Sequence, residues 1–314
     1  MRANPPPPHA AAAGHRAIGD LPRPGLAAYR PARRTAGLAG LLVLPLLWAT
    51  LAACSTPGPT HPPVLLLGEV HDNAAGHALR LQTLAQQVNA GARPALLMEQ
   101  FDREMQPQID QARQHAPGMP PGDAELDAAV DALVKLGSPA TGAATWDWAL
   151  YRPVLRLALQ HRLPIVAANV SRADARRVMQ QGLAATGFNP AVPADIARAQ
   201  AADIADSHCG QINPTQAARM ALAQVARDQA MAQTVDRYAE RGVVLLAGNG
   251  HVRNDIGVPR WLSAQTRQRA KTIAYLEPGD GRPANAFDEA VPVPAQPRDD
   301  PCKAMTVPQP RPPV

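Results

Sequence analysis

Four short apolar runs in this chain each end on polar residues that could do chemistry. The runs are hydrophobic at every position rather than at alternate ones, and helical patterns separate them, which is typical of buried parallel strands. Each run and its polar end are Val64–Leu67 with Gly68, Glu69 and His71; Ala95–Met98 with Glu99; Ile165–Ala168 with Asn169; and Val243–Ala247 with Gly248, Asn249 and His251. Because parallel sheets bind ligands at the carboxyl ends of their strands, two carboxylates and two imidazoles should meet at one edge.

The spacing predicts an α/β fold, in which a mainly parallel sheet is flanked by helices and a smaller all-helical subdomain is inserted. Expected strands cover residues 64–68, 94–98, 164–168, 243–247 and 272–276, and expected helices cover 75–90, 123–136, 147–161 and 214–238. Further helix starts are expected at Ser171, at Asn189-Pro190 and at Asn213-Pro214, where a capping residue stands first. We therefore expect a sheet domain of residues 64–170 and 240–280, a helical subdomain of 171–239, and a Pro-rich, extended or disordered tail of 281–314.

The first 53 residues predict an export signal preceded by a disordered extension. Arg33 and Arg34 stand before an apolar run from Gly37 to Ala53, and Leu51-Ala-Ala-Cys54 follows the order of a secretory signal with small residues at its cleavage site. That ending resembles the lipobox of bacterial lipoproteins, so Cys54 is the expected lipidation site and residues 54–63 form a linker. Ser55 then indicates the outer membrane, with the protein facing the periplasm. The alternative is a transmembrane anchor, because the run approaches the length of about 17 residues that can span a bilayer.

The formal charge of +5 does not indicate a nucleic-acid partner. Residues 1–53 contain six Arg and one Asp, so the whole excess lies in the expected signal, and the remaining 25 basic residues balance 25 acidic ones. No nucleic acid is therefore expected as a partner. With Cys54 lipidated, Cys209 and Cys302 remain, and export to an oxidising compartment favours a disulfide between them over two free thiols.

The strand ends suggest two kinds of chemistry. Glu69 and His71 are two positions apart, so on a regular strand they share a face. With Glu99 and His251 they offer ligands for a divalent metal such as Zn, Mn or Fe, whose bound water would hydrolyse a substrate. Without a metal, Glu69 paired with His71 would still move protons.

Each of these residues also has a purely structural interpretation. Glu69 at a strand end can cap the helix that follows, and Glu99 can pair with Arg103 on a helix starting there. His77, His115 and His161 are expected on helix or loop surfaces, in contact with solvent.

Several longer motifs carry a resemblance to a known family. They are Val64–Asn73, Leu97–Phe101, Trp146–Pro153, Arg227–Ala232 and Gly248–Arg260. In these motifs the chain resembles the ChaN-like family of bacterial iron-regulated, haem-binding lipoproteins, which is similar to the wider Tiki, TraB and erythromycin-esterase superfamily.

The resemblance implies a parallel-sheet domain with a smaller helical one, and haem bound where two copies of the chain meet. It implies a tyrosine or histidine on the iron, for which Tyr151 is the candidate, and Arg152 or Arg156 would pair a propionate. In the wider superfamily the positions of Glu69, His71, Glu99 and His251 serve hydrolysis, and Arg227 would reach that site from the long helix.

The leading hypothesis is therefore a membrane-anchored lipoprotein that binds haem or iron, in haem or iron uptake, as a homodimer. The alternative is a metal-dependent hydrolase that uses the Glu and His cluster at the carboxyl edge of the sheet. A third class, a lipoprotein that only acts as a scaffold, predicts that Glu69→Gln changes no binding property.

Overall fold

The structure is a computed structural model that describes residues 62–114, 123–138, 146–283, 285–300 and 302–303, which belong to one compact unit. The signal predicted for residues 1–53 and the lipidation of Cys54 fall outside these ranges. Within the described ranges, no helix combines the length and the apolar character that crossing a bilayer requires.

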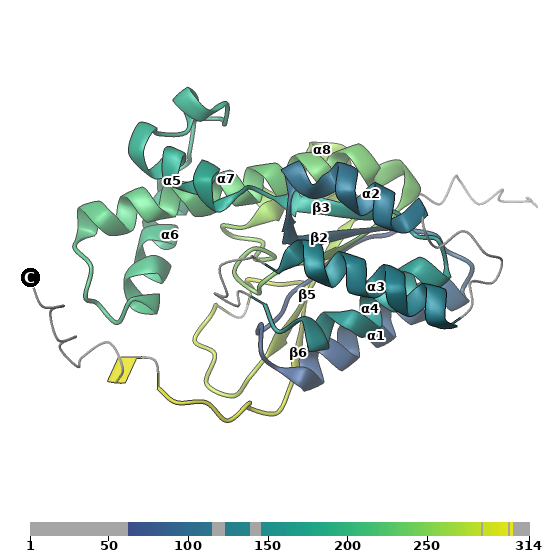
Figure 1. The fold of residues 1–314 in the computed structure, drawn as a ribbon. Helices are drawn as coiled ribbons and strands as arrows, with labels where there is room; N and C mark the ends of the chain where they lie inside the picture. The colour runs from purple at the N-terminus through teal and green to yellow at the C-terminus, as the bar shows by residue number, and fades with distance from the viewer. Residues whose placement is uncertain (1–61, 115–122, 139–145, 284, 301, 304–314) are drawn as a thin grey trace, which may run out of the picture. The chain divides into compact units, whose positions relative to one another are not determined.

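A six-stranded sheet with all neighbouring strands parallel lies at the centre of this unit (Figure 1). The strands are β1 (Val64–Leu67), β2 (Ala95–Asp102), β3 (Ile165–Asn169), β4 (Val243–Leu246), β5 (Ala270–Leu276) and β6 (Glu289–Pro292). Their order is β3-β2-β4-β1-β5-β6, and the register sets Leu246 beside both Leu67 and Met98. The predicted α/β fold is confirmed, and Leu67, Leu246 and Met98 lie level in the three central strands.

Two strand predictions need correction. Strand β2 continues past Glu99 to Asp102, with an irregular register against β3 after Met98, so no helix starts at Glu99. Strand β6 lies in the tail that we expected to be extended or disordered, and it pairs with β5 at the sheet edge. An edge strand is held by backbone hydrogen bonds on one side, so β6 can form without an apolar pattern, and its proline ends it.

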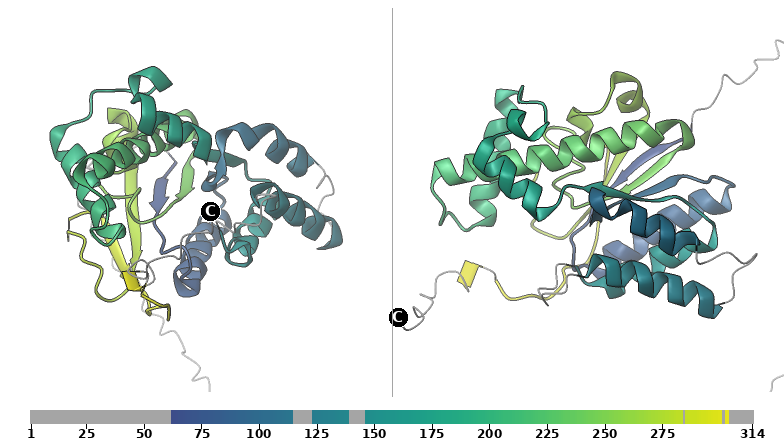
Figure 2. Two further views of the ribbon diagram at one scale, coloured as in Figure 1. Left: turned by 60° about the vertical axis from the view of Figure 1, so that its left-hand side comes forward. Right: turned by 45° about the horizontal axis from the view of Figure 1, so that its top comes forward.

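Helices cover both faces of the sheet (Figure 2). One face packs against α1 (Ala74–Asn89), α2 (Gln106–Gln114), α3 (Asp123–Gly137) and α4 (Trp148–Gln160). The other packs against α7 (Pro214–Tyr238) and the turns near α8 (Ala264–Arg269). Successive strand residues alternate between the two layers, as Leu65 and Leu66 do, which explains why these strands are apolar throughout.

Between β3 and β4 the described chain forms α5 (Arg172–Gln181), α6 (Ala194–Ser207) and α7, and these helices share a hydrophobic cluster of their own. The predicted caps are confirmed at Ser171 and at Asn213, which forms a capping box with Gln216. The helix start predicted at Asn189-Pro190 is wrong. Asn189 instead bonds Gln229 of α7 through its backbone, which holds it in a loop before α6.

The chain also contains the predicted disulfide. Cys209, in the turn after α6, is bonded to Cys302, with a distance of 5.6 Å between the two Cα atoms. The bond closes a loop of 93 positions and ties the end of the described chain to the helices between β3 and β4.

Candidate functional site

Glu69 lies at the carboxyl end of β1 and is the hub of the site. Its Oε1 accepts hydrogen bonds from His71 Nδ1 (2.6 Å), Tyr151 Oη (2.5 Å) and Gln100 Nε2 (3.2 Å), and its Oε2 forms an ion pair with buried Arg80. Burial would raise the pKa of Glu69, but Arg80 and the hydrogen bond from His71 outweigh it and lower the pKa. Glu69 is therefore a buried, ionised carboxylate with no free oxygen.

His71 carries the one half-exposed imidazole of the site, with 51% of its side chain accessible. Its Nδ1 faces Glu69, and Trp146 packs edge-on against the ring at 4.8 Å between centroids. A Cβ at Gly248 would lie 3.0 Å from His71 Cε1 and 3.2 Å from its Nε2, so a larger residue there would displace the imidazole by a few tenths of an ångström. Because Nδ1 is occupied, Nε2 is the atom that His71 can offer to a ligand.

A second imidazole is enclosed between two carboxylates. His251 Nδ1 donates to Asp228 Oδ1 at 2.6 Å, and His251 Nε2 lies 3.4 Å from Glu99 Oε1. The other oxygen of Glu99 accepts the backbone N–H of Gly248 at 2.7 Å. Burial would lower the pKa of His251, but the charges of Glu99 and Asp228 raise it to about 10. His251 is thus a fixed positive charge at neutral pH.

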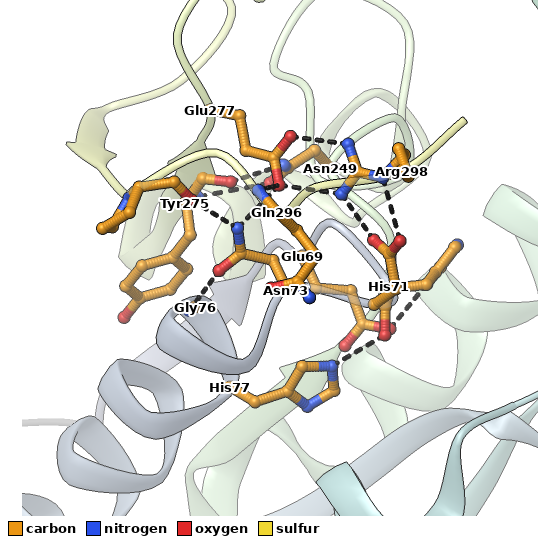
Figure 3. Close-up of polar contacts among 12 residues, drawn as sticks. Glu69, His71, Asn73, Gly76, His77, Asn249, Tyr275, Glu277, Gln296 and Arg298 are labelled. Atoms are coloured by element: carbon orange, nitrogen blue, oxygen red, sulfur yellow. Dashed lines mark hydrogen bonds and ion pairs between the residues drawn. The ribbon is translucent and has the colours of Figure 1, made fainter. Parts of the chain in front are cut away.

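Behind Glu69 lies a chain of buried polar groups. Arg80 Nη2 donates to His77 Nδ1 at 2.7 Å. His77 Nε2 in turn donates to the backbone carbonyl of His71 at 3.0 Å (Figure 3). Burial and the charge of Arg80 lower the pKa of His77, which keeps this ring neutral. We expected His77 to be solvated, and that prediction is wrong, because Glu69 requires Arg80 and Arg80 in turn requires an acceptor. His161 ends α4, and His115 lies outside the described residues.

Glycines and amides let the strand ends approach one another. A Cβ at Gly68 would lie 2.1 Å from Asn249 Oδ1, and Asn249 Nδ2 donates to the carbonyl of Tyr275 on β5 at 2.8 Å. On the other side, Arg227 Nη1 of α7 donates to Asn169 Oδ1 at 2.6 Å. The backbone around the site is therefore fixed from both sides.

A pocket of about 470 Å³ opens at this edge of the sheet. Both imidazoles, Glu99 and two arginines line it. The lining residues are His71, Glu99, Gln100, Asp102, Met105, Leu136, Gly137, Trp146, Asn169, Arg172, Gln224, Arg227 and His251. Glu69 does not line the pocket and acts on it through His71.

The predicted Zn, Mn or Fe site is not supported by this donor set. The oxygens of Glu69 already hold Arg80, Tyr151 and His71, and both nitrogens of His251 face carboxylates. The described residues contain no group of three or more His, Cys, Asp or Glu side chains placed to hold a metal ion. Arg80, a cation buried beside Glu69, already provides the positive charge that this carboxylate requires.

Two assignments made by resemblance also need correction. Tyr151 is fully buried and its hydroxyl donates to Glu69, so it lacks the exposure that an iron ligand needs. Burial and the nearby charge of Glu69 raise its pKa further, which disfavours a tyrosinate. Arg152 and Arg156 lie on the outer side of α4, where Arg152 pairs with Asp131 of α3, and neither lines the pocket.

Sequence reasoning missed six polar residues of the site, of which Asp102 and Gln224 only line the pocket and the other four make the contacts described above or supply positive charge. Those four are Arg80, Gln100, Arg172 and Asp228. Asp228 is adjacent to Arg227 and Gln100 is adjacent to Glu99, so the quoted motifs contained a signal for both. Arg80 sits among apolar residues of a helix, where a charged side chain is usually taken to face solvent.

The chain matches one protein-family model. The match covers residues 60–262, and the family is described as haem-binding uptake, Tiki superfamily, ChaN. This chain belongs to that family, as its motifs predicted. The comparison with curated proteins finds no match.

One solved structure superposes well enough to show the same fold, and two others score lower. ChaN of Campylobacter jejuni, described as binding haem cofacially, superposes with a TM-score of 0.57 at 17% identity over 72% of this chain and 85% of that one. The type III effector HopBA1 gives 0.41 at 12% identity over 74% and 88%, and the erythromycin esterase EreC gives 0.39 at 13% over 72% and 74%. The likeness to ChaN concerns the fold alone.

The charge on His251 can be measured as a function of pH. We expect NMR of the ring nitrogens to show it protonated at neutral pH and losing its proton near pH 10. Since this pKa lies above the unfolded value of 6.5, its contribution to stability is complete below pH 6.5 and is lost as pH rises through about 10. Asp228→Asn should lower the pKa of His251 by about 1–3 units, whereas His161→Gln, far from the pocket, should leave it unchanged. A His251 that titrates near 6.5 would contradict this assignment.

Proposed function

We propose that this protein binds haem in the pocket at the carboxyl edge of the sheet, with His71 Nε2 as the iron ligand. Membership of a family described by haem-binding uptake supports the choice of ligand. The observation that carries the proposal is the pairing of His71 Nδ1 with the buried carboxylate of Glu69 at 2.6 Å, which leaves Nε2 for the pocket. Histidines that bind metals commonly donate their other ring N–H to a carboxylate in this way, which fixes the tautomer and makes the ligating nitrogen more basic.

The rest of the pocket suits a porphyrin with acidic substituents. Arg172 and Arg227 line it. Guanidinium groups form bidentate hydrogen bonds with carboxylates such as haem propionates. Trp146, which packs against His71, and Met105 contribute apolar surface to the pocket. If haem binds, it would supply an iron that takes a protein ligand, and His71 would provide that ligand through Nε2.

Haem binding is tested with haemin and the chain from residue 57 onward. We expect a shift of the Soret band and near-stoichiometric uptake at micromolar haemin. His71→Ala should weaken binding about 10- to 100-fold, since it removes the ligand, and Arg172→Ala with Arg227→Ala should weaken it less. Arg152→Ala is the matched control, because Arg152 is half-exposed and outside the pocket.

No Soret shift at micromolar haemin would end the haem proposal. If the His71→Ala variant bound haemin with unchanged affinity, a residue other than His71 would be the iron ligand. The homodimer that the resemblance implies remains a proposal, and measuring the molecular mass with and without haemin tests it in the same samples.

We also propose that Cys54 carries the lipid anchor and that the protein faces the periplasm from the outer membrane, in haem or iron uptake. The support is the Leu51-Ala-Ala-Cys54 ending after the apolar run. Expressed in a bacterial host, the full chain should incorporate labelled palmitate and sediment with outer membranes. Cys54→Ser should abolish both, whereas Ser55→Ala should abolish neither. Labelling that survives Cys54→Ser would refute the anchor.

A second candidate is acid–base hydrolysis without a metal. It is favoured by two imidazoles with different surroundings on one pocket. His71 is half-exposed and hydrogen-bonded to Glu69, so its deprotonated ring would accept a proton from water, while the enclosed and charged His251 would stabilise a developing anion. A chromogenic ester should then be hydrolysed in a reaction that chelators leave unchanged. His71→Ala should lower kcat by about 100-fold or more, and the Arg152→Ala control should not. Turnover that survives His71→Ala, or that chelation abolishes, would contradict this mechanism.

A further inference from the structure

The segment that follows β6 returns across the loop that carries His71. We call residues 293–300 the strap, and it is the yellow segment leaving β6 in Figure 1. Beyond it, Cys302 is bonded to Cys209 in the turn after α6. The strap thus runs from the edge of the sheet to the helices between β3 and β4, and neither haem binding nor hydrolysis uses it.

Backbone hydrogen bonds hold the first half of the strap. Val293 N–H donates to the carbonyl of Leu276 at 2.9 Å, and Gln296 N–H donates to Glu277 Oε1 at 3.0 Å. The carbonyl of Pro294 accepts Asn73 Nδ2 at 2.7 Å. The strap therefore contacts both the end of β5 and the start of α1.

Arg298 holds the second half of the strap, because its guanidinium forms bidentate hydrogen bonds with two carboxylates (Figure 3). Its Nε and Nη2 donate to the two oxygens of Asp72 at 2.9 and 2.7 Å. Its Nη1 and Nη2 donate to the two oxygens of Glu277 at 2.6 and 2.8 Å. One guanidinium thereby joins the loop after β1 to the end of β5.

Asp72 and Asn73 make this contact relevant to the site. Asp72 directly follows His71, and Asn73 caps α1 by accepting Gly76 N–H at 2.8 Å while donating to Glu277 Oε1 at 2.6 Å. The loop that presents His71 is consequently held from within by Glu69 and from outside by the strap.

The outer attachment depends on the disulfide. Arg298 is 38% exposed and Asp72 is 52% exposed, and ion pairs this accessible contribute little by themselves. The covalent bond at Cys302, four positions after Arg298, keeps the guanidinium close to its partners and so raises its effective concentration there.

We infer that the strap is a redox-sensitive latch on the loop that carries His71. A reduced dithiol, such as a thioredoxin-like carrier, would open it by thiol–disulfide exchange. In that step the carrier gives two electrons and two protons to the Cys209–Cys302 bond, which becomes two thiols, and the carrier becomes a disulfide. With its end released, the strap leaves Asp72 more often and the loop gains mobility.

The latch is tested by amide hydrogen exchange, which needs no ligand. The chain is compared oxidised, after reduction by dithiothreitol, as Cys209→Ser with Cys302→Ser, and as Arg298→Ala. We expect amides of residues 70–76 to exchange about tenfold faster in each altered form, while those of β1, β2 and β4 keep their rates. Arg298→Ala added to the reduced chain should change little, because the two changes release the same contact.

Lys271→Ala is the matched control, since it removes an exposed ion pair with Glu289 between β5 and β6 without touching the strap. Unchanged exchange of residues 70–76 on reduction would overturn the latch. Equal acceleration throughout the sheet would overturn it too, because the disulfide would then only stabilise the fold as a whole. A parallel haemin titration of the oxidised and reduced chain rests on the proposed function, and its failure would leave the exchange result standing.

Discussion

The buried ion pair between Arg80 and Glu69 is the interaction on which the site depends. A carboxylate at the end of a central strand is costly to bury, and removing one partner of such a pair commonly costs about 3–5 kcal/mol. Here Arg80 supplies the opposite charge, His77 satisfies Arg80, and Tyr151 and Gln100 satisfy the carboxylate. Glu69 is consequently held ionised and immobile, and it fixes the direction in which His71 points.

The strand order explains why the other charged groups gather around this pair. Strand β4 lies between β1 and β2, so Gly248, two positions after its end, donates its N–H to Glu99 and lies against the imidazole of His71. The loop after β4 then turns His251 back toward Asp228 of α7. The pocket therefore combines one half-exposed histidine ring, His71, with one enclosed and charged ring, His251.

Most of the fold could be predicted from the sequence, because the central strands are apolar on both faces and few other structures produce that pattern. It also located Glu69, His71, Glu99 and His251, since the carboxyl ends of parallel strands share an edge. It could not reveal Arg80, because one charged residue on an amphipathic helix looks the same whether it faces solvent or a buried carboxylate. Strand β6 was not predicted because an edge strand is held by backbone hydrogen bonds to its neighbour and needs no apolar pattern of its own. Asn189-Pro190 has the residues of a helix start, but the bond to Gln229 places it in a loop.

The central claim is that Glu69 orients His71 so that its Nε2 meets the ligand in the pocket. A crystal structure of the haem-loaded protein tests this most directly. The account predicts iron on His71 Nε2, with the His71–Glu69 hydrogen bond retained and Arg172 or Arg227 at a propionate. Iron held by another residue, with the pocket beside His71 left without haem, would contradict it.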